Sequence, residues 1–288
     1  MERMSGVARD AVALVVDGAR SRSRHRVVWA LPALGGGNYL YLWMYAWARS
    51  REGQEIRVLH HAPMDPWLEM FPRLQDLTIR RSDVPFLAER RMNVWNQAFE
   101  EYGQETLDAF IDDVILSPPR FAAMLDAHES DRPALMLNVR RGDYYSNPEF
   151  RSQYGMDLRP YAEAALNLAG VDTDAPFALH VISDDPEWCR RVLPEWCPHA
   201  EIIVPPREDG ALGDLARLIT AERLILANST FSYWAGYVKN RRDTLLGRDG
   251  AVIAPEFHVR SINGGRAFQL PPQWPTVDNV DAEMARRP

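Results

Sequence analysis

Short apolar runs alternate with helix-like segments over residues 134–238, and this order limits the possible folds more than any other feature of the chain. The runs ALMLNVRR, FALHVIS, AEIIVPP and LILAN have the length of β-strands, and each precedes a segment whose apolar residues recur at helical spacing. Strands that alternate with helices form parallel sheets with right-handed crossovers. The second half of the chain is therefore predicted to be a doubly wound α/β domain.

The first part of the chain contains the same kinds of element. VVWALPAL is an apolar run of strand length, GGGN interrupts it, and YLYLWMYAWA follows as an aromatic helix. EIRVLHHAP and LTIRRSDVPF supply further strands, and the polar, proline-ended stretch ESDRP marks a boundary near residue 131. We predict a polar arm (residues 1–26), a first α/β domain (27–130), a second α/β domain (131–260) and a tail (261–288) that packs back on the first domain.

Composition and charge argue against several classes of protein. The 288 residues are 46% hydrophobic and carry a formal net charge of −7, whereas a nucleic-acid-binding protein needs a basic face. The cysteines Cys189 and Cys197 have too few histidine or cysteine neighbours for a zinc site, and VARDAVALVV is too short to span a membrane. We expect a cytoplasmic protein without metal or cofactor, whose contact with a membrane would be peripheral.

Polar residues follow the predicted strands of the second domain. In such sheets ligands bind beyond the carboxyl ends of the strands. Because side chains alternate across a strand, Arg140 shares a face with Asn138, whereas Arg141 points the opposite way. We predict that Arg140 binds a ligand anion and that Arg141 pairs with Asp143 or with a neighbouring loop.

Two further strand ends carry polar turns that open helices. ANSTFSYWAGY begins a helix whose free N–H groups and dipole suit an anion, although a plain N-cap by Ser229 or Thr230 is equally typical. SDDPEW resembles an acidic metal-binding pair, but Pro186 at the first helical position favours an ordinary helix start.

VRRGDYYSNPEF, VISDDPEW and LANSTFSYWAGY, in that order, resemble the three motifs of the inverting α-1,2-fucosyltransferases. GGGNYLYLWMYAWAR is similar, more weakly, to the N-terminal motif of that family, so the likeness extends from Gly35 to Pro255. The resemblance implies a GT-B fold, with two facing Rossmann-like domains and parallel sheets. It also implies a GDP-fucose donor held by the C-terminal domain, a glycan or glycoside acceptor with a galactoside 2-hydroxyl, and no metal requirement.

The resemblance assigns roles to individual residues. Arg140 matches the arginine that contacts the donor diphosphate. The other positions that it implies for donor binding come from all four motifs: Gly37, Asn38, Asn138, Asp184, Asp185, Asn228, Ser229, Thr230 and Phe231. Asp185 matches the acidic residue that recognises guanine. Asn138 stands where the family has histidine, and Tyr39 stands where it has glutamine.

The proton acceptor is left open by the sequence. Asp143 and Glu149 are the carboxylates nearest to the arginine pair, with Asp143 also suited to orient Arg141. His60 and His61 are further candidates, for which a loop or packing role is the alternative.

The tryptophans Trp43, Trp47, Trp67 and Trp95 fall in the first domain, where an aromatic face can stack on a sugar. Most of them are expected to pack in the core, because Trp43 and Trp47 are four residues apart on one helix.

Other functions remain as alternatives. A glycine-rich turn suggests a nicotinamide-dependent oxidoreductase, but GGGNYLYL lacks the GxGxxG spacing. A non-catalytic relative that binds sugar nucleotides, and an enzyme with another donor, are both compatible with Asn138 in place of histidine.

Overall fold

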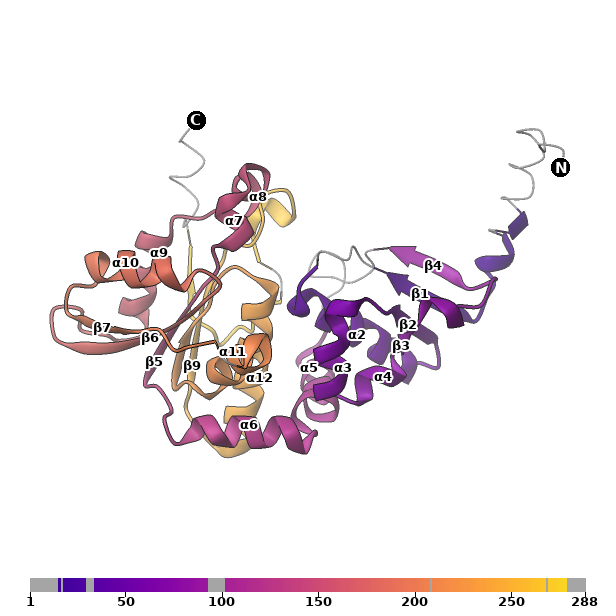
Figure 1. Cartoon of the computed structure of the whole chain (residues 1–288), viewed down its shortest axis with the longest axis horizontal. Coiled ribbons are helices and arrows are strands. Elements are labelled where there is room, and N and C mark those ends of the chain that lie inside the picture. Colours follow the sequence, from indigo (N-terminus) through magenta and orange to yellow (C-terminus); the bar gives the residue numbers. More distant parts are fainter. Residues whose placement is uncertain are drawn as a thin grey trace. The chain divides into compact units, whose positions relative to one another are not determined.

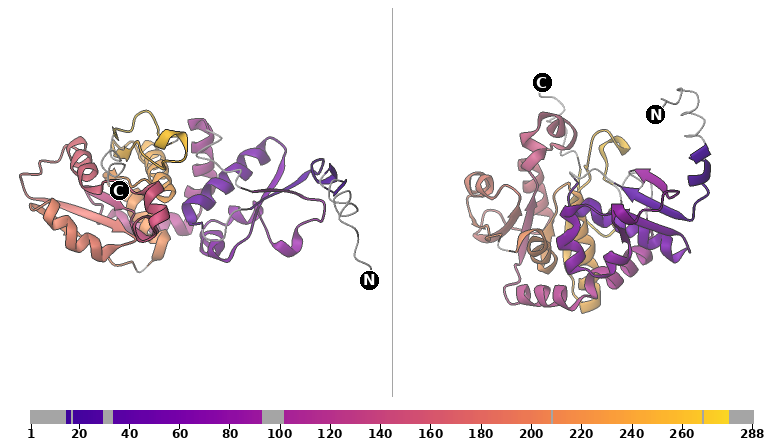
Figure 2. Two further views of the ribbon diagram at one scale, coloured as in Figure 1. Left: turned by 90° about the horizontal axis from the view of Figure 1, so that it is seen from above. Right: turned by 45° about the vertical axis from the view of Figure 1, so that its right-hand side comes forward.

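The computed structural model describes residues 15, 16, 18–29, 34–92, 102–207, 209–267 and 269–278. It divides into two compact units, residues 1–99 and 100–288, and each is described by itself. Figure 1 labels their helices and strands, and Figure 2 shows them from two further directions.

The first unit is a four-stranded parallel sheet in the order β3-β2-β1-β4. Alternation of buried and exposed residues in EIRVL is typical of a strand with one covered face. Its elements are β1 (His25–Trp29), α2 (Gly36–Arg51), β2 (Glu55–Leu59), η1 (Ala62–Met64), α3 (Asp65–Met70), α4 (Arg73–Asp76), β3 (Thr78–Ile79), η2 (Arg81–Asp83) and β4 (Glu89–Met92).

Helix α2 is buried along almost its whole length, as expected for a helix that is apolar on every side. Trp43 and Trp47 lie in this core, so their predicted packing role is confirmed. Trp67 is buried too, and its ring lies so close to Gly36 that a Cβ there would be 2.0 Å from Cζ2. Trp95 lies outside the described residues.

The second unit is a six-stranded parallel sheet flanked by helices. Its elements are α5 (Gln104–Phe110), the π-helical segment η3 (Ile111–Leu116), α6 (Pro119–Glu129), β5 (Leu135–Val139), α7 (Gly142–Ser146), α8 (Pro148–Tyr154), α9 (Leu158–Leu168), β6 (Phe177–Ser183), α10 (Pro186–Trp196), β7 (Ala200–Ile203), α11 (Gly210–Thr220), β8 (Arg223–Ile225), α12 (Thr230–Leu246), β9 (Ala251–Pro255), η4 (Asn263–Gly265) and β10 (Thr276–Val277).

The strand order of this sheet, β10-β9-β8-β5-β6-β7, reverses direction at β5. The chain builds outward from β5 through β6 to β7, and it then returns to the other side of β5 to form β8, β9 and β10. Right-handed crossovers therefore place α9 and α10 on one face and α11 and α12 on the other (Figure 1). The topological switch point lies at the carboxyl ends of the neighbouring strands β5 and β8, and doubly wound proteins bind ligands at such a point.

Strand β5 lies at the centre of the sheet, and all of its residues are buried. Leu135, Leu137 and Val139 join the apolar core beneath α9 and α10. Met136 and Asn138 face the opposite side because side chains alternate along a strand. The predicted fold class, α/β with a parallel sheet in each of two units, is confirmed.

The division of the chain differs from the boundary expected near residue 131. The structure divides at residues 99 and 100, because α6 packs against α11 of the second unit. A bidentate contact of Arg241 on α12 with Asp112 on η3 fastens the preceding segment to the same unit. The polar stretch ESDRP is thus a connection within the second unit.

Near each end of the described chain lies a strand of one of the two sheets. Residues 25 and 26 of the expected polar arm belong to β1. In the expected tail, Thr276 and Val277 extend the second sheet as β10, so this part packs on the second unit rather than the first. Residues 1–14 and 279–288 lie outside the described ranges. Within those ranges, the helices lack the length and apolar character that crossing a bilayer requires.

Candidate functional site

The polar residues predicted from the three motifs meet at the switch point of the second sheet. Strand β5 pairs with β6 on one side and with β8 on the other, and all three are parallel. Their carboxyl ends therefore lie at one edge, where the loops before α7, α10 and α12 begin.

Arg140 follows β5 directly and is held by two carboxylates. Its Nη2 lies 2.5 Å from Oδ1 of Asp143, and its Nη1 lies 2.8 Å from Oδ2 of Asp184. The guanidinium also lies 5.0 Å from the ring centroid of Tyr144. A guanidinium carries five N–H donors, and the side chain of Arg140 is 34% exposed, so it can still bind an anion from solvent.

Arg141 points elsewhere, as the alternation along the strand predicted. Its Nε donates to Oδ2 of Asp185 at 3.3 Å, and its guanidinium lies 4.0 Å from the ring centroid of Trp188. The partner of Arg141 is thus the neighbouring loop. The other expectation, that Asp143 orients Arg141, is not met, because Asp143 pairs with Arg140.

Gly142 lets the β5 and β6 loops approach each other. A Cβ at this position would lie 2.3 Å from Oδ2 of Asp184, which is closer than real Cβ contacts. The other oxygen of Asp184 accepts a hydrogen bond from the backbone N–H of Arg141 at 2.7 Å. The glycine of the RRGD motif therefore makes room for the carboxylate that positions both arginines.

Asp185 caps helix α10, as the sequence favoured. Its Oδ1 accepts the N–H of Trp188 at 3.2 Å, and Pro186 occupies the first turn. Beneath it, burial raises the pKa of the Cys189 thiol to about 11, and a hydrogen bond from Ser183 acts in the opposite direction.

Asn138 joins the end of β5 to both neighbouring segments. Its Nδ2 donates to the carbonyl of Ile182 at 2.9 Å, and its Oδ1 accepts a short hydrogen bond from the Ser232 hydroxyl in the first turn of α12. The side chain is buried, and its amide is engaged on both sides. Asn138 therefore ties the Arg140 loop to the start of α12.

Helix α12 begins beside this link. Ser229 is the N-cap, and its Oγ accepts the N–H of Ser232 at 3.2 Å. The N–H groups of Thr230 and Phe231 have no acceptor among the described residues, as is typical of a first turn. With the helix dipole, these two donors suit an anion.

Asn228 fixes the preceding turn rather than facing solvent. Its Nδ2 donates to the carbonyls of Tyr154 and His258, at 2.8 and 3.1 Å. The start of α12 is thereby fastened to α8 and to the segment after β9. This gives Asn228 a supporting position in the site.

An aromatic group beside Arg140 was not expected from the sequence. Tyr144 stacks on Tyr154 with ring centroids 4.5 Å apart. The rings of Tyr154 and His258 form a T-shaped pair with centroids 6.1 Å apart. Burial raises the pKa of Tyr144 well above its ordinary value, against the effect of Arg140. Burial also lowers the pKa of His258 to about 4, so its ring is neutral at pH 7. The position of His258 just beyond β9 is the signal that could have identified it.

The two carboxylates proposed as proton acceptors have different surroundings. Asp143 is bound to Arg140. Glu149 lies in the first turn of α8 and is exposed, while its backbone N–H donates to the N-cap Asn147 at 2.9 Å. Glu149 is thus the less engaged of the two.

The remaining candidates lie in the first unit. Gly37 and Asn38 occupy the first turn of α2. His60 follows β2 and hydrogen-bonds to Asp65, whereas Nε2 of His61 is buried without a partner among the described residues. No three His, Cys, Asp or Glu side chains gather as a metal site within the described ranges.

The model of glycosyl transferase family 11 matches residues 119–259 of the chain. That segment, which is just under half of the chain, is similar to the family 11 glycosyltransferases. It contains all three motifs of the site, and the resemblance predicted from those motifs is confirmed.

Two glycosyltransferases from Escherichia coli are similar to part of this chain. The chain is 30% identical to an alpha-1,2-colitosyltransferase over 108 residues, which are 37% of each protein. It is 26% identical to the O-antigen biosynthesis glycosyltransferase WbnK over 110 residues, 38% of this chain and 36% of that one. The match thus spans little more than a third of these curated relatives.

Two solved structures show distant similarity to this chain. The fucosyltransferase NodZ from Bradyrhizobium aligns with a TM-score of 0.42 and 14% identity, over 74% of this chain and 93% of that one. POFUT1 in complex with GDP aligns with a TM-score of 0.39 and 11% identity, over 76% of this chain and 95% of that one.

Proposed function

We propose that the protein is an inverting α-1,2-fucosyltransferase that moves L-fucose from GDP-fucose to a hydroxyl of a glycan or glycoside, the 2-hydroxyl of a galactoside being the acceptor group. The observation that supports this most directly is the Asn138–Ser232 hydrogen bond. It joins the loop of Arg140 to the first turn of α12, so that one diphosphate can reach a guanidinium and free N–H groups.

Arg140 is the cation of this proposed donor site. Asp143 and Asp184 hold its guanidinium at the end of β5. A fixed cation stabilises the charge that develops on departing GDP, and a preorganised donor of this kind typically contributes about 3–4 kcal/mol. The N–H groups of Thr230 and Phe231 supply the second contact.

The reaction itself is a single displacement. The acceptor oxygen forms a bond to the anomeric carbon while the bond to the GDP oxygen breaks, and the configuration inverts. The acceptor proton goes to a carboxylate, for which we propose Glu149, since Asp143 is engaged with Arg140. We propose that no metal takes part, and that Asp185 and Asp184 border the guanine.

A second candidate differs only in the donor sugar. The relative that is 30% identical is named an alpha-1,2-colitosyltransferase, and Asn138 stands where the resembling family has histidine. A transferase for another GDP-linked deoxysugar would use the same Arg140 and α12 contacts. Its donor selectivity would arise where the sugar, rather than the nucleotide, is bound.

A panel of nucleotides tests the donor assignment. Thermal stability is measured with GDP, UDP, TDP and their sugars, with and without chelator. At about 100 times Kd, the correct ligand adds about 2.7 kcal/mol to the free energy of unfolding. We expect stabilisation by GDP and GDP-fucose that chelator leaves unchanged, together with an α-linked product by NMR. Stabilisation by UDP or TDP alone, or dependence on a divalent cation, would contradict the assignment.

A further inference from the structure

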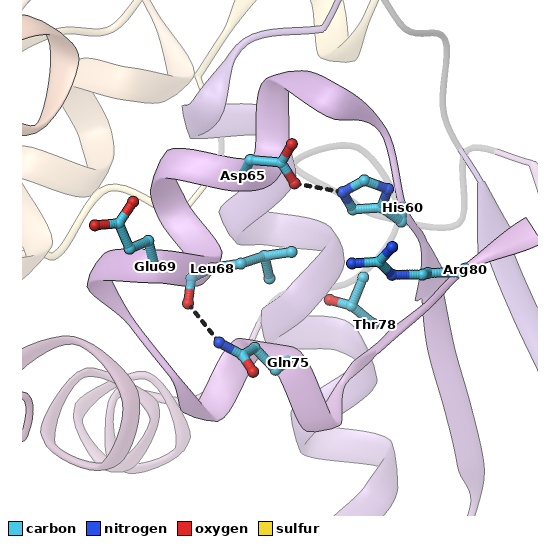
Figure 3. A pocket seen from close by; sticks show the side chains of 7 residues that line it. All are labelled: His60, Asp65, Leu68, Glu69, Gln75, Thr78 and Arg80. Carbon is cyan, nitrogen blue, oxygen red and sulfur yellow. Dashed lines mark hydrogen bonds and ion pairs between the residues drawn. The ribbon is translucent and has the colours of Figure 1, made fainter.

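A polar cavity lies within the first unit, at the carboxyl ends of β2 and β3 (Figure 3). Its volume is about 360 Å³, which is within the range of small-ligand sites. Side chains from the ends of two strands and from helices α3 and α4 converge on it. Leu68 supplies an apolar wall, and the remaining lining residues are polar or charged.

His60 and Asp65 form a fixed pair on one side of the cavity. Nε2 of His60 lies 2.6 Å from Oδ1 of Asp65, so an ionised Asp65 places the ring proton on Nε2. Nδ1 then carries the lone pair and can accept a hydrogen bond from a hydroxyl. Figure 3 shows this second ring nitrogen without a bond to any residue drawn there.

Arg80 and Gln75 offer the complementary donors and acceptors. Arg80 points into the cavity beside His60 and Thr78 (Figure 3), and its guanidinium has no hydrogen-bond or ion-pair partner among the described residues. Gln75 donates through Nε2 to the carbonyl of Leu68 at 3.1 Å, and this orients its Oε1 as a free acceptor. Planar groups of these kinds can bind adjacent hydroxyls.

The mixed lining selects the class of ligand. Asp65 and Glu69 place carboxylates around the cavity, and Arg80 adds a guanidinium. Hydrogen-bond acceptors and donors therefore line the same cavity, and hydroxyl groups can match both. A neutral sugar with neighbouring hydroxyls would satisfy both the donors and the acceptors.

We propose that this cavity binds a neutral sugar ring of the acceptor, with Arg80 and Asp65 as its specificity-determining residues. The identification of that sugar as acceptor depends on the proposed transferase function. The binding itself does not, because the cavity is formed wholly by the first unit.

Lactose, as a neutral β-galactoside, is the probe. Its binding to the full chain is measured by saturation-transfer NMR without donor, and KM values are measured for lactose and GDP-fucose. We expect Arg80→Ala and Asp65→Asn each to weaken lactose binding and raise its KM about tenfold or more, as for a lost charged hydrogen bond. The KM for GDP-fucose and kcat should change by less than about twofold.

Matched variants lie beside the cavity. Arg81 and Asp76 are exposed residues of the same types that do not line it, so Arg81→Ala and Asp76→Asn should leave lactose binding intact. Unchanged lactose binding in both test variants, or tighter binding of methyl β-glucuronide than of lactose, would overturn the proposal. Failure of GDP-fucose to bind would refute the transferase assignment alone, because the lactose titration requires no donor.

Discussion

Arg140 and Asp184 meet across the ends of two adjacent strands, with Nη1 and Oδ2 2.8 Å apart. Asp184 also accepts the backbone N–H of Arg141, so one carboxylate positions the side chain of the first arginine and the backbone of the second. The candidate donor site is thus held by contacts between its own loops. This preorganisation determines what each substitution should do.

Arg140→Lys should lower kcat by about 100- to 1000-fold, the usual effect of removing a donor that stabilises developing charge. Lysine keeps the positive charge but lacks the planar guanidinium, whose paired N–H groups can donate two hydrogen bonds to one phosphate. The melting temperature should stay close to that of the wild type because Arg140 is partly exposed. Arg159→Lys, on the surface of α9, is the control and should leave kcat unchanged. An unchanged kcat of the Arg140 variant would show that Arg140 does not bind the diphosphate.

Gly142→Ala should displace Asp184 and thereby release Arg140. The added Cβ lies 2.3 Å from Oδ2 of Asp184, and overpacking of this kind costs about 1–3 kcal/mol. We expect weaker GDP-fucose binding in calorimetry together with a lower midpoint in urea. Gly103→Ala is the control, because nothing lies within 4 Å of its Cβ position. Equal behaviour of the two variants would show that Asp184 adapts without effect.

Glu149→Gln and Asp143→Asn should separate proton removal from positioning. If Glu149 takes the acceptor proton, its variant loses kcat by about 100-fold or more and keeps the KM for GDP-fucose. Asp143→Asn removes a charge that holds Arg140 and should mainly change donor binding. Steady-state kinetics with both substrates distinguishes these patterns, and the reverse assignment of losses would make Asp143 the base.

His258 should make the fold sensitive to acid. Burial lowers its pKa to about 4 in the folded protein, whereas the ordinary value is 6.5. Between these values the unfolded chain binds a proton that the folded chain does not, so the free energy of unfolding falls as the pH falls from 6.5 towards 4. The full difference is roughly 3 kcal/mol.

Urea unfolding of the wild type and His258→Phe between pH 7 and 4.5 measures this effect. Phenylalanine keeps a ring against Tyr154 and loses the titration, so the variant should show a flatter dependence on pH. His128 and His180, whose pKa values burial also lowers, are common to both proteins and cancel in the comparison. Parallel pH curves would contradict a neutral, buried His258.

Much of the second unit could be predicted from the sequence because its strands are buried on both faces. Such strands are continuous apolar runs, and the residues after them are the ones that meet at the sheet edge. The separate directions of Arg140 and Arg141 followed from alternation alone. The two partners of Arg140 did not, since Asp143 and Asp184 are brought to it by loop geometry that no periodicity encodes.

Other elements lacked a local signal. Strand β4 has the sequence ERRM, whose charges conceal its place beside β1. Helix α7 lies inside the first motif and helix α8 begins in it, and the motif has no helical repeat of apolar residues. The grouping of Tyr154 with His258 depends on β9 lying next to β8, and strand order is a property of packing rather than of any one segment.

The hydrogen bond between Asn138 and Ser232 links the identities of two residues that are distant in the sequence. Both side chains are buried, so a larger ring at position 138 would need a different occupant at position 232. Relatives that keep histidine at the first position should therefore differ at the second as well. Positions 138 and 232 would then vary together. Exchanging one of them alone between homologues would disturb the contact between the Arg140 loop and helix α12.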